Sequence, residues 1–394
     1  MSEARHAVVL SGGGAYAAYE IGVLKALFQG RSPATGKQPL EPAIYTGTSA
    51  GAFNAALLVS HSDRPATEAL ARLESIWRDE IAGRPNKHNG VYRARMDPAL
   101  WLNPLHILRN PREELAHLFE DSVFLSRDAL RRTANLFTSK APLMRRVIDL
   151  VDVGSLFNTE PFAELIERIL RPRIIQDSPR ALRIAVTNWS TGELRVFKNK
   201  EMTDAHAHRV VQASAAIPGF FPPVNINGDT YVDGGVVMNT PLEPAIKAQA
   251  DVVHVVYLDP DVRKIPIDRI QSTVSALDRL LVVSMANAVN RDIETANLIN
   301  QGLKHMDKTE AMSAKEMTVH ATLEARQQEK PEKVYRKLFI HRYHPSEDLG
   351  DVTGILNMEL SNIESLIEKG YRDTVEHNCT QSQCVWPDLP EFSP

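Results

Sequence analysis

A serine framed by glycines is the first candidate for chemistry in this sequence. The segment Gly47–Gly51 reads Gly-Thr-Ser-Ala-Gly and fits the pattern G-x-S-x-G with Ser49 at its centre. Small residues on both sides of such a serine allow a tight, strained turn that lifts the hydroxyl out of the sheet edge. The turn also places the backbone N–H of Ala50 at a helix N-terminus, beside a developing oxyanion. We therefore expect Ser49 to be a nucleophile, with Gly47 and Gly51 as the small residues that the turn requires.

A run of three glycines, Gly12–Gly14, follows the first apolar segment and allows two functional interpretations. Its backbone N–H groups can form an oxyanion hole, or Gly12-x-Gly14-x-x-Ala17 can be a dinucleotide fingerprint. The fingerprint requires an acidic residue roughly 20 positions on, at the end of the next strand. Glu41 lies 24 residues after Ala17 (41 − 17) but precedes the next strand. This position weakens the nucleotide interpretation, and a plain βα turn is the third alternative.

A third glycine-marked site, Asp233-Gly234-Gly235, lies 184 residues after Ser49 (233 − 49). An aspartate before two glycines is often only a turn residue, because both types favour turns. Its functional interpretation is a general base, since a serine hydroxyl needs a nearby group to accept its proton. A carboxylate can act in this way when burial raises its pKa toward the working pH. The apolar stretch 217–221 could provide those surroundings.

A Ser-His-Asp triad is the competing hydrolase mechanism, and it requires a histidine after the acid. Six histidines follow Asp233, namely His254, His305, His320, His341, His344 and His377. None lies in a segment with a clear turn signature, and His254 is in an apolar strand, which is typical of a packed core residue. The pair His206 and His208 has no third ligand nearby in the sequence, so we predict no metal site.

The elements that position these residues alternate between strands and helices. Apolar strand-like segments at 7–10 and 43–46 each end at a glycine turn and are followed by helical patterns at 19–28 and 52–59. Such alternation predicts an α/β fold with parallel strands. Further strands are expected at 182–187, 193–197, 251–258 and 337–343, and long amphipathic helices over 267–303. The spacing Ser361-Asn362-Ile363-Glu364 predicts a capping box that opens a last helix.

Composition excludes several classes of protein. The 394 residues are 43% hydrophobic and 24% charged, which is incompatible with wholesale disorder, and the net charge of −4 argues against a nucleic-acid partner. Two cysteines, Cys379 and Cys384, cannot form a disulfide framework, and whether they pair stays open.

We predict no transmembrane helix and no Sec signal, hence a cytoplasmic protein, with peripheral membrane contact left open. Segment 84–146 carries twelve Lys/Arg against six Asp/Glu and is interpreted as a basic lid, a membrane-facing surface or a plain solvated surface.

Together and in this order, the three glycine-marked sites resemble the patatin-like phospholipase family, in its bacterial type. Further similarity lies in Tyr19–Leu24 and Ala213–Pro223. The resemblance implies a three-layer α/β fold with a mostly parallel central sheet flanked by helices. It implies a catalytic domain over 6–260 with a helical, basic insertion at 84–160, and a helical C-terminal extension over 261–394 packed on the core.

The resemblance also implies a Ser49–Asp233 dyad and an acyl-enzyme intermediate, with no cofactor or catalytic metal. Gly13 and Gly14 would supply oxyanion N–H groups, Ala50 a further one, and phospholipid or another acyl-ester lipid would be the substrate. Phospholipase A, lysophospholipase and general carboxylesterase activities all fit. The sequence departs from the family in having Ala15-Tyr16-Ala17 after the glycines, where the family usually has a basic residue and a glycine at the last two positions. We expect activity to survive with a shifted substrate preference. A nucleotide-binding protein and a catalytically silent interaction module stay as alternatives, and the oligomeric state is unknown.

Overall fold

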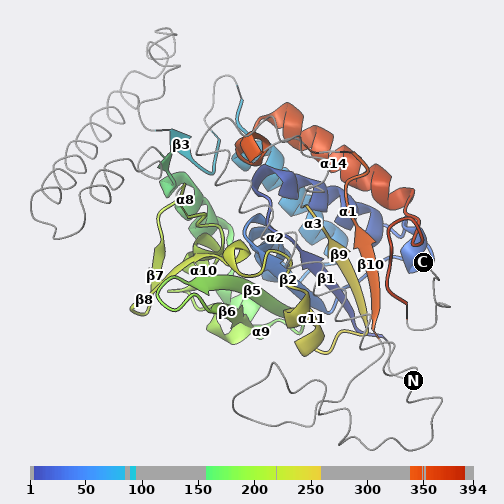
Figure 1. Ribbon diagram of the computed structural model, residues 1–394, viewed down its shortest axis with the longest axis horizontal. Coiled ribbons are helices and arrows are strands. Elements are labelled where there is room, and N and C mark those ends of the chain that lie inside the picture. Colours follow the sequence, from blue (N-terminus) through green and yellow to red (C-terminus); the bar gives the residue numbers. More distant parts are fainter. Residues whose placement is uncertain are drawn as a thin grey trace, which may run out of the picture.

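Short apolar segments that alternate with helices build a sheet with helices packed against it in the computed structural model (Figure 1). The structure describes residues 4–84, 89–94, 157–218, 220–258, 338–347, 349 and 352–386. Two predictions, the long helices over 267–303 and most of the basic segment 84–146, lie outside the described residues.

The central sheet is mixed but mostly parallel, in the order β10-β9-β1-β2-β5-β8-β7, with β6 also paired to β5. The first five of these strands are parallel to their neighbours, and β6, β7 and β8 are antiparallel. The strands are β1 (His6–Leu10), β2 (Ile44–Thr48), β5 (Ala181–Asn188), β6 (Leu194–Lys198), β7 (Val224–Ile226), β8 (Asp229–Asp233), β9 (Val252–Val256) and β10 (Phe339–Tyr343). A separate pair joins β3 (Arg93–Ala94) to β4 (Phe157–Asn158).

Both faces of the sheet are covered, because side chains alternate between the faces along each strand. On β1, Val8 and Leu10 belong to a large apolar core, whereas Ala7 and Val9 belong to a second one. The helices of the large core are α1 (Ala18–Phe28), α2 (Ala50–Ser60), α3 (Ala66–Ile76), α8 (Glu160–Ile169), α9 (Pro172–Asp177), α10 (Ala207–Ser214) and α14 (Leu360–Val375). Helix α11 (Leu242–Lys247) covers the other face. The predicted three-layer α/β fold is thus confirmed.

The C-terminal part contributes both a strand and a helix to this architecture. Strand β10 pairs with β9 at one edge of the sheet, and α14 runs alongside α1 (Figure 1). The two helices approach closely, since a Cβ added to Gly22 would lie 1.9 Å from the carbonyl oxygen of Ile367. The chain after residue 260 is therefore more than a helical addition, and the proposed domain boundary stays a prediction.

The predicted capping box at Ser361 is wrong. Helix α14 begins at Leu360, with Glu359 as its N-cap residue and no side-chain capping hydrogen bond. Because Ser361 already has helical backbone, its hydroxyl cannot cap the helix from the preceding position. Glu364 forms an ion pair with Arg78 instead, which links α14 to the segment after α3.

Candidate active site

The register of the sheet brings the three glycine-marked segments close together, because the strand ends next to them are aligned. Strand ends that are far apart in sequence are neighbours, through the pairs Leu10–Gly47, Thr48–Ala185 and Val186–Asp233. The glycine run follows Leu10, Ser49 follows Thr48, and Asp233 ends β8. All three predicted segments therefore meet around the ends of β1, β2 and β8.

Ser49 lies at the turn between β2 and α2 in a left-handed backbone conformation, with φ 55° and ψ −128°. This conformation is costly for a residue with a side chain and persists only where the surroundings hold it. One such support is Ser214, whose hydroxyl accepts a hydrogen bond from the Ser49 N–H at 2.9 Å. The same hydroxyl donates to the carbonyl oxygen of Ala185 at 2.7 Å. Helix α10 and strand β5 thereby fix the turn.

Glycines around Ser49 are required by close backbone contacts. A Cβ on Gly47 would lie 2.3 Å from the carbonyl oxygen of Gly51. A Cβ on Gly51 would lie 2.5 Å from the carbonyl oxygen of Leu10. Both distances are far below van der Waals contact, so the G-x-S-x-G pattern is imposed by the crossing of the turn over β1.

The glycine run lies directly against this turn. Gly12 donates its N–H to the carbonyl oxygen of Asn239 at 3.1 Å, and the Asn239 side-chain amide donates back to the Gly12 carbonyl at 3.2 Å. A Cβ on Gly12 would meet the Asn239 side chain at 2.3 Å and the Cβ of Ser49 at 3.0 Å. Gly12 therefore allows the loop to approach the serine.

The predicted oxyanion donors Gly13, Gly14 and Ala50 lie in the two segments that meet at Ser49. Gly14 has a left-handed φ of 55° and opens a 3₁₀ turn, Gly14–Ala17. In the described part of the chain, the N–H groups of Gly13 and Gly14 donate no hydrogen bond in a turn or loop. Ala50 is the first residue of α2, where an N–H has no partner within the helix.

Asp233 is 3% exposed and ends β8 beside Ser49. Its Oδ1 accepts a hydrogen bond from the N–H of Gly235 at 2.7 Å. Its Oδ2 is buried and has no hydrogen-bond partner among the described residues. Burial raises the pKa of Asp233 to about 7, although the Gly235 N–H and the nearby Ser49 side chain act in the opposite direction. Such a carboxyl group can both accept and return a proton near neutral pH.

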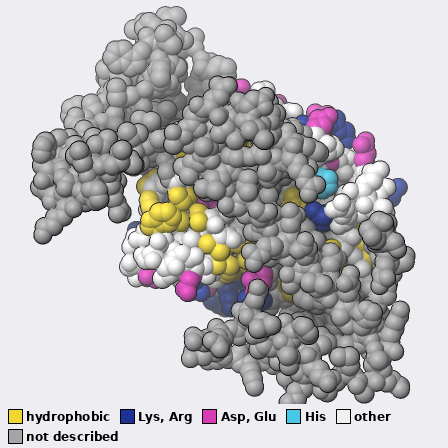
Figure 2. Space-filling model, in the orientation of Figure 1, with side chains coloured by type: hydrophobic (Ala, Val, Ile, Leu, Met, Phe, Trp, Pro, Cys, Tyr) yellow, Lys and Arg dark blue, Asp and Glu magenta, His cyan; other side chains and the backbone are white. Residues whose placement is uncertain are grey.

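An apolar pocket opens beside Ser49, with a cavity volume of ≈ 40 Å³. Its walls come from the N-terminal helices, from α8, from the segment after α10 and from the segment before α14, and they are almost entirely hydrophobic. The lining residues are Gly14, Ser49, Ala50, Phe53, Trp77, Ile81, Val91, Phe162, Ala215, Ile217, Phe221, Ile355, Leu356 and Met358. Figure 2 shows hydrophobic side chains on the part of the described surface that faces the viewer.

Tyr16, which stands where the family usually has a basic residue, is 3% exposed. A Cβ on Gly354 would lie 2.0 Å from the Tyr16 hydroxyl oxygen, so the ring reaches the turn Val352–Leu356. That turn carries Ile355 and Leu356 of the pocket wall. Tyr16 thus supports the pocket from behind, and the predicted shift in substrate preference stays a prediction.

Of the six histidine candidates for a triad, the structure describes His254, His341, His344 and His377. None of these four lines the pocket at Ser49. His254 is buried on β9, where its Nε2 lies 3.2 Å from Nδ1 of His6. His206, which was weighed with His208 only as a metal pair, precedes α10, and its Nδ1 lies 3.0 Å from the Thr203 hydroxyl oxygen. His305 and His320 lie outside the described residues.

Two residues that support the site escaped prediction. Ser214 lies in a small-residue helix that the sequence places near the site but does not connect to Ser49. Asn239 follows Asp233 by six residues (239 − 233), and its side-chain amide donates a hydrogen bond to the Gly12 carbonyl oxygen in the glycine run. The proximity of Asn239 to the Asp-Gly-Gly segment is the one sequence signal that could have indicated its role.

Comparison with known proteins identifies the class. The chain matches the family described as Patatin-like phospholipase over residues 8–246, which is more than half of its length. The chain therefore belongs to the patatin-like phospholipase family, a family of lipid acyl hydrolases. Among solved structures it is similar to VipD from Legionella pneumophila, at 16% identity and a TM-score of 0.35, over 97% of this chain and 67% of VipD. None of the described helices is long and apolar enough to cross a membrane.

Proposed function

We propose that this chain is a serine lipid acyl hydrolase with Ser49 as nucleophile and Asp233 as general base. The observation that supports this best is the meeting of a strained serine turn with a buried carboxyl group. Ser49 has a left-handed backbone, and the nearby Asp233 has a pKa raised by burial to about 7. A base with a pKa near the working pH is the most effective partner for a hydroxyl nucleophile.

The proposed reaction has two steps. Ser49 attacks the ester carbonyl carbon while Asp233 accepts the hydroxyl proton, and the protonated Asp233 then donates that proton to the departing alcohol. The acyl group is left on the Ser49 oxygen. In the second step Asp233 takes a proton from water, the water oxygen attacks the acyl carbon, and the fatty acid leaves as the proton returns to Ser49.

The N–H groups of Gly13 and Gly14 are proposed as the oxyanion hole, with Ala50 as a further donor. They adjoin the serine, because they directly follow Gly12, where an added Cβ would lie only 3.0 Å from the Cβ of Ser49. Backbone donors fixed in advance need no reorganisation when negative charge develops on the carbonyl oxygen. The loop is held from the other side by Asn239.

The apolar pocket at Ser49 favours an acyl chain as the group bound beside the nucleophile. Val236 and Val237, which directly follow the Asp-Gly-Gly segment, are 37% and 39% exposed. Exposed apolar side chains beside an active site fit contact with a lipid surface. We therefore propose an acyl-ester lipid, such as a phospholipid or lysophospholipid, as substrate, with peripheral membrane contact and short-chain esters also accepted.

The test is release of fatty acid from a panel of phospholipids, lysophospholipids and short-chain esters. Wild-type protein, Ser49→Ala and Asp233→Asn are compared at pH 8. We expect release by the wild type and a loss of at least about 10³-fold in each variant. Full activity of Asp233→Asn would refute the dyad and return attention to the histidines.

The two alternatives have their own outcomes in this test. Nucleotide-dependent thermal stabilisation without ester hydrolysis would favour a nucleotide-binding protein. Against it, Glu41 is already engaged, accepting hydrogen bonds from Arg180 at 2.7 Å and from the N–H of Ala66 at 3.1 Å. The absence of both hydrolysis and nucleotide binding would indicate a silent interaction module.

A further inference from the structure

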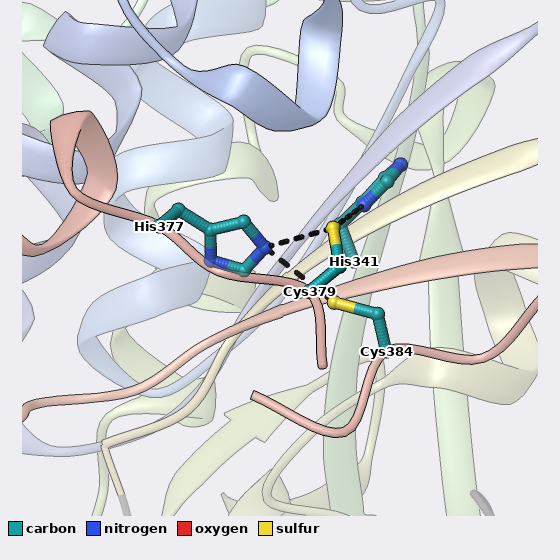
Figure 3. Close-up of side chains that lie close together, drawn as sticks. All are labelled: His341, His377, Cys379 and Cys384. Atoms are coloured by element: carbon teal, nitrogen blue, oxygen red, sulfur yellow. Dashed lines mark hydrogen bonds between the residues drawn. The ribbon is translucent and has the colours of Figure 1, made fainter. Parts of the chain in front are cut away.

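Four side chains with soft metal-ligand atoms converge away from Ser49, at the β10 edge of the sheet (Figure 3). His341 lies on β10, and His377, Cys379 and Cys384 follow α14. One ligand atom from each of the four lies within 4.8 Å of all the others. Three of these residues are buried and Cys379 is half-buried, so the cluster is largely closed to solvent.

The distances match those around a tetrahedral metal ion. Cys379 Sγ lies 3.5 Å from His341 Nδ1 and 3.4 Å from His377 Nε2. Cys384 Sγ lies 3.5 Å from His377 Nε2. Zn–S bonds of about 2.3 Å and Zn–N bonds of about 2.05 Å at tetrahedral angles give an N···S separation of about 3.6 Å. Three of the four N···S pairs therefore already have the spacing that a shared zinc ion would impose.

Neighbouring groups orient two of the ligand side chains. The backbone N–H of Arg342 donates to Cys384 Sγ at 3.3 Å. An N–H that points at a cysteine sulfur stabilises the thiolate form, which is the form that binds metal. His377 Nδ1 lies 3.5 Å from the Ser382 hydroxyl oxygen, which leaves Nε2 facing the sulfurs. Outer partners of this kind are a regular feature of protein zinc sites.

The chain holds this geometry with backbone hydrogen bonds. The N–H of Cys384 donates to the carbonyl oxygen of Cys379 at 2.9 Å, which closes the loop between the two thiols. Val385 and Ile340 exchange two hydrogen bonds of 2.9 and 3.0 Å, which place the loop beside β10. The order His377-x-Cys379-x₄-Cys384 resembles the short ligand spacing of structural zinc sites.

We propose that His341, His377, Cys379 and Cys384 form a structural Zn²⁺ site. Two thiolates and two neutral imidazoles in tetrahedral array are a donor set that selects zinc over harder cations such as Mg²⁺. All four positions are filled by protein, which leaves no open position for a substrate. The ion would fasten the segment after α14 to strand β10, and would thereby hold α14 against α1. This site is independent of the proposed catalytic chemistry.

No metal site is predicted from the sequence, because the ligands are far apart in it. His341 precedes His377 by 36 residues (377 − 341), and the antiparallel bridge between Ile340 and Val385 places the segment after α14 beside His341. A disulfide between Cys379 and Cys384 is the competing use of the thiols. It would remove both sulfur ligands, so the two interpretations exclude one another.

The test measures zinc in the full-length protein, purified without a histidine tag, under reducing conditions and without chelator. We expect about one zinc ion per chain in the wild type and below about 0.1 in the double variant Cys379→Ser/Cys384→Ser. His344→Ala is the matched control, since His344 is an exposed neighbour on the same segment and is not one of the four ligands. It should keep the wild-type zinc content.

Two further measurements use wild-type protein, so they test the proposal even if the double variant does not fold. Cobalt added to metal-free protein should give the visible bands of tetrahedral Co²⁺ with thiolate ligands. Removal of zinc should lower Tm by at least about 5 °C, with recovery on addition of Zn²⁺ but not of Mg²⁺. Wild-type protein that holds below about 0.1 zinc per chain after incubation with Zn²⁺ would overturn the proposal. So would a Cys379–Cys384 disulfide found by mass spectrometry under these reducing conditions.

Discussion

The hydroxyl of Ser214 bridges the backbone N–H of Ser49 and the carbonyl oxygen of Ala185, at 2.9 Å and 2.7 Å. Ser214 is fully buried, so water cannot replace either hydrogen bond. The bridge joins the strained turn of the proposed nucleophile to strand β5, which also pairs with the strand that ends at Asp233. Ser214 is therefore a positioning residue for the turn that carries Ser49.

Ser214→Ala removes this bridge, so that the buried Ser49 N–H loses its hydrogen-bond partner and the Ala185 carbonyl oxygen loses one donor. We expect kcat to fall by about 10-fold or more with little change in KM, because the turn loses the support of its left-handed backbone. Stability should fall by about 1–3 kcal/mol. Steady-state kinetics on a soluble ester give the measurement.

The matched control for that variant is Ser60→Ala. Ser60 is also buried, but its hydroxyl donates to the Leu57 carbonyl oxygen at the far end of α2. It should leave kcat near the wild-type value. An equal fall in kcat in both variants would mean that Ser214 acts only through general stability.

Asp233 sets the expected pH dependence. Its carboxyl group must be ionised to accept the Ser49 proton, and its pKa is raised to about 7 by burial. We therefore expect kcat/KM to rise about tenfold per pH unit below pH 7 and to level off above it. A pH–rate profile on a substrate without titratable groups provides the measurement, and a profile flat from pH 5 to 8 would contradict the assignment.

The same raised pKa predicts a gain in stability on substitution. A carboxyl whose folded-state pKa lies above its unfolded value favours folding at low pH, and this contribution is lost as pH rises through about 7. Asp233→Asn should therefore be more stable than wild type at pH 8, by up to about 4 kcal/mol, and should lose this advantage near pH 4. Denaturant unfolding at both pH values measures the difference.

Asp229→Asn is the control for that stability difference, because Asp229 is exposed at the start of the same strand. It should show no gain in stability at pH 8. A gain of equal size in both variants would point to net charge instead of burial.

Gly51→Ala should abolish activity and weaken the fold. The added Cβ would lie 2.5 Å from the Leu10 carbonyl oxygen, which is a backbone atom that cannot turn away. Gly83→Ala is the matched control, since its Cβ would meet its nearest neighbour at an ordinary 3.5 Å. Thermal unfolding and ester hydrolysis should both be near wild type for Gly83→Ala. If both variants behave like wild type, the turn is not held as tightly against β1 as described.

The apolar pocket predicts chain-length selectivity. Ala215 lines the pocket, and Ala215→Phe would fill part of its ≈ 40 Å³ cavity. We expect kcat/KM for long-chain esters to fall at least about tenfold relative to short-chain esters. The short-chain substrate is the internal control for folding and for Ser49. An equal loss at every chain length would show that the acyl chain does not bind there.

The turns that carry Ser49 and Asp233 could be predicted because each is encoded by a few adjacent residues with a local backbone reason, whereas their catalytic role stays a proposal. Gly47, Ser49 and Gly51 define a turn wherever they follow a strand, and Asp233 is marked by the two glycines after it. Ser214 could not be predicted as a partner of Ser49, since 165 residues separate them (214 − 49) and only the packing of α10 on β5 joins them.

In the C-terminal part too, contacts between residues far apart in the sequence could not be predicted. A strand was expected over 337–343, but the place of β10 beside β9 depends on tertiary pairing that no short segment encodes. The capping box at Ser361 failed for a related reason, because the helix begins at the residue before it. Local patterns specify turns and elements, whereas contacts between distant elements decide the register and the buried clusters.

The central claim is that Ser49 carries the acyl group during turnover. The most direct measurement is mass spectrometry of the protein quenched rapidly during hydrolysis of a long-chain ester, followed by peptide mapping. We predict an added acyl group on the peptide that contains Ser49, and no such group in Ser49→Ala. An acyl group on another residue, or hydrolysis at the wild-type rate by Ser49→Ala, would contradict the proposed mechanism.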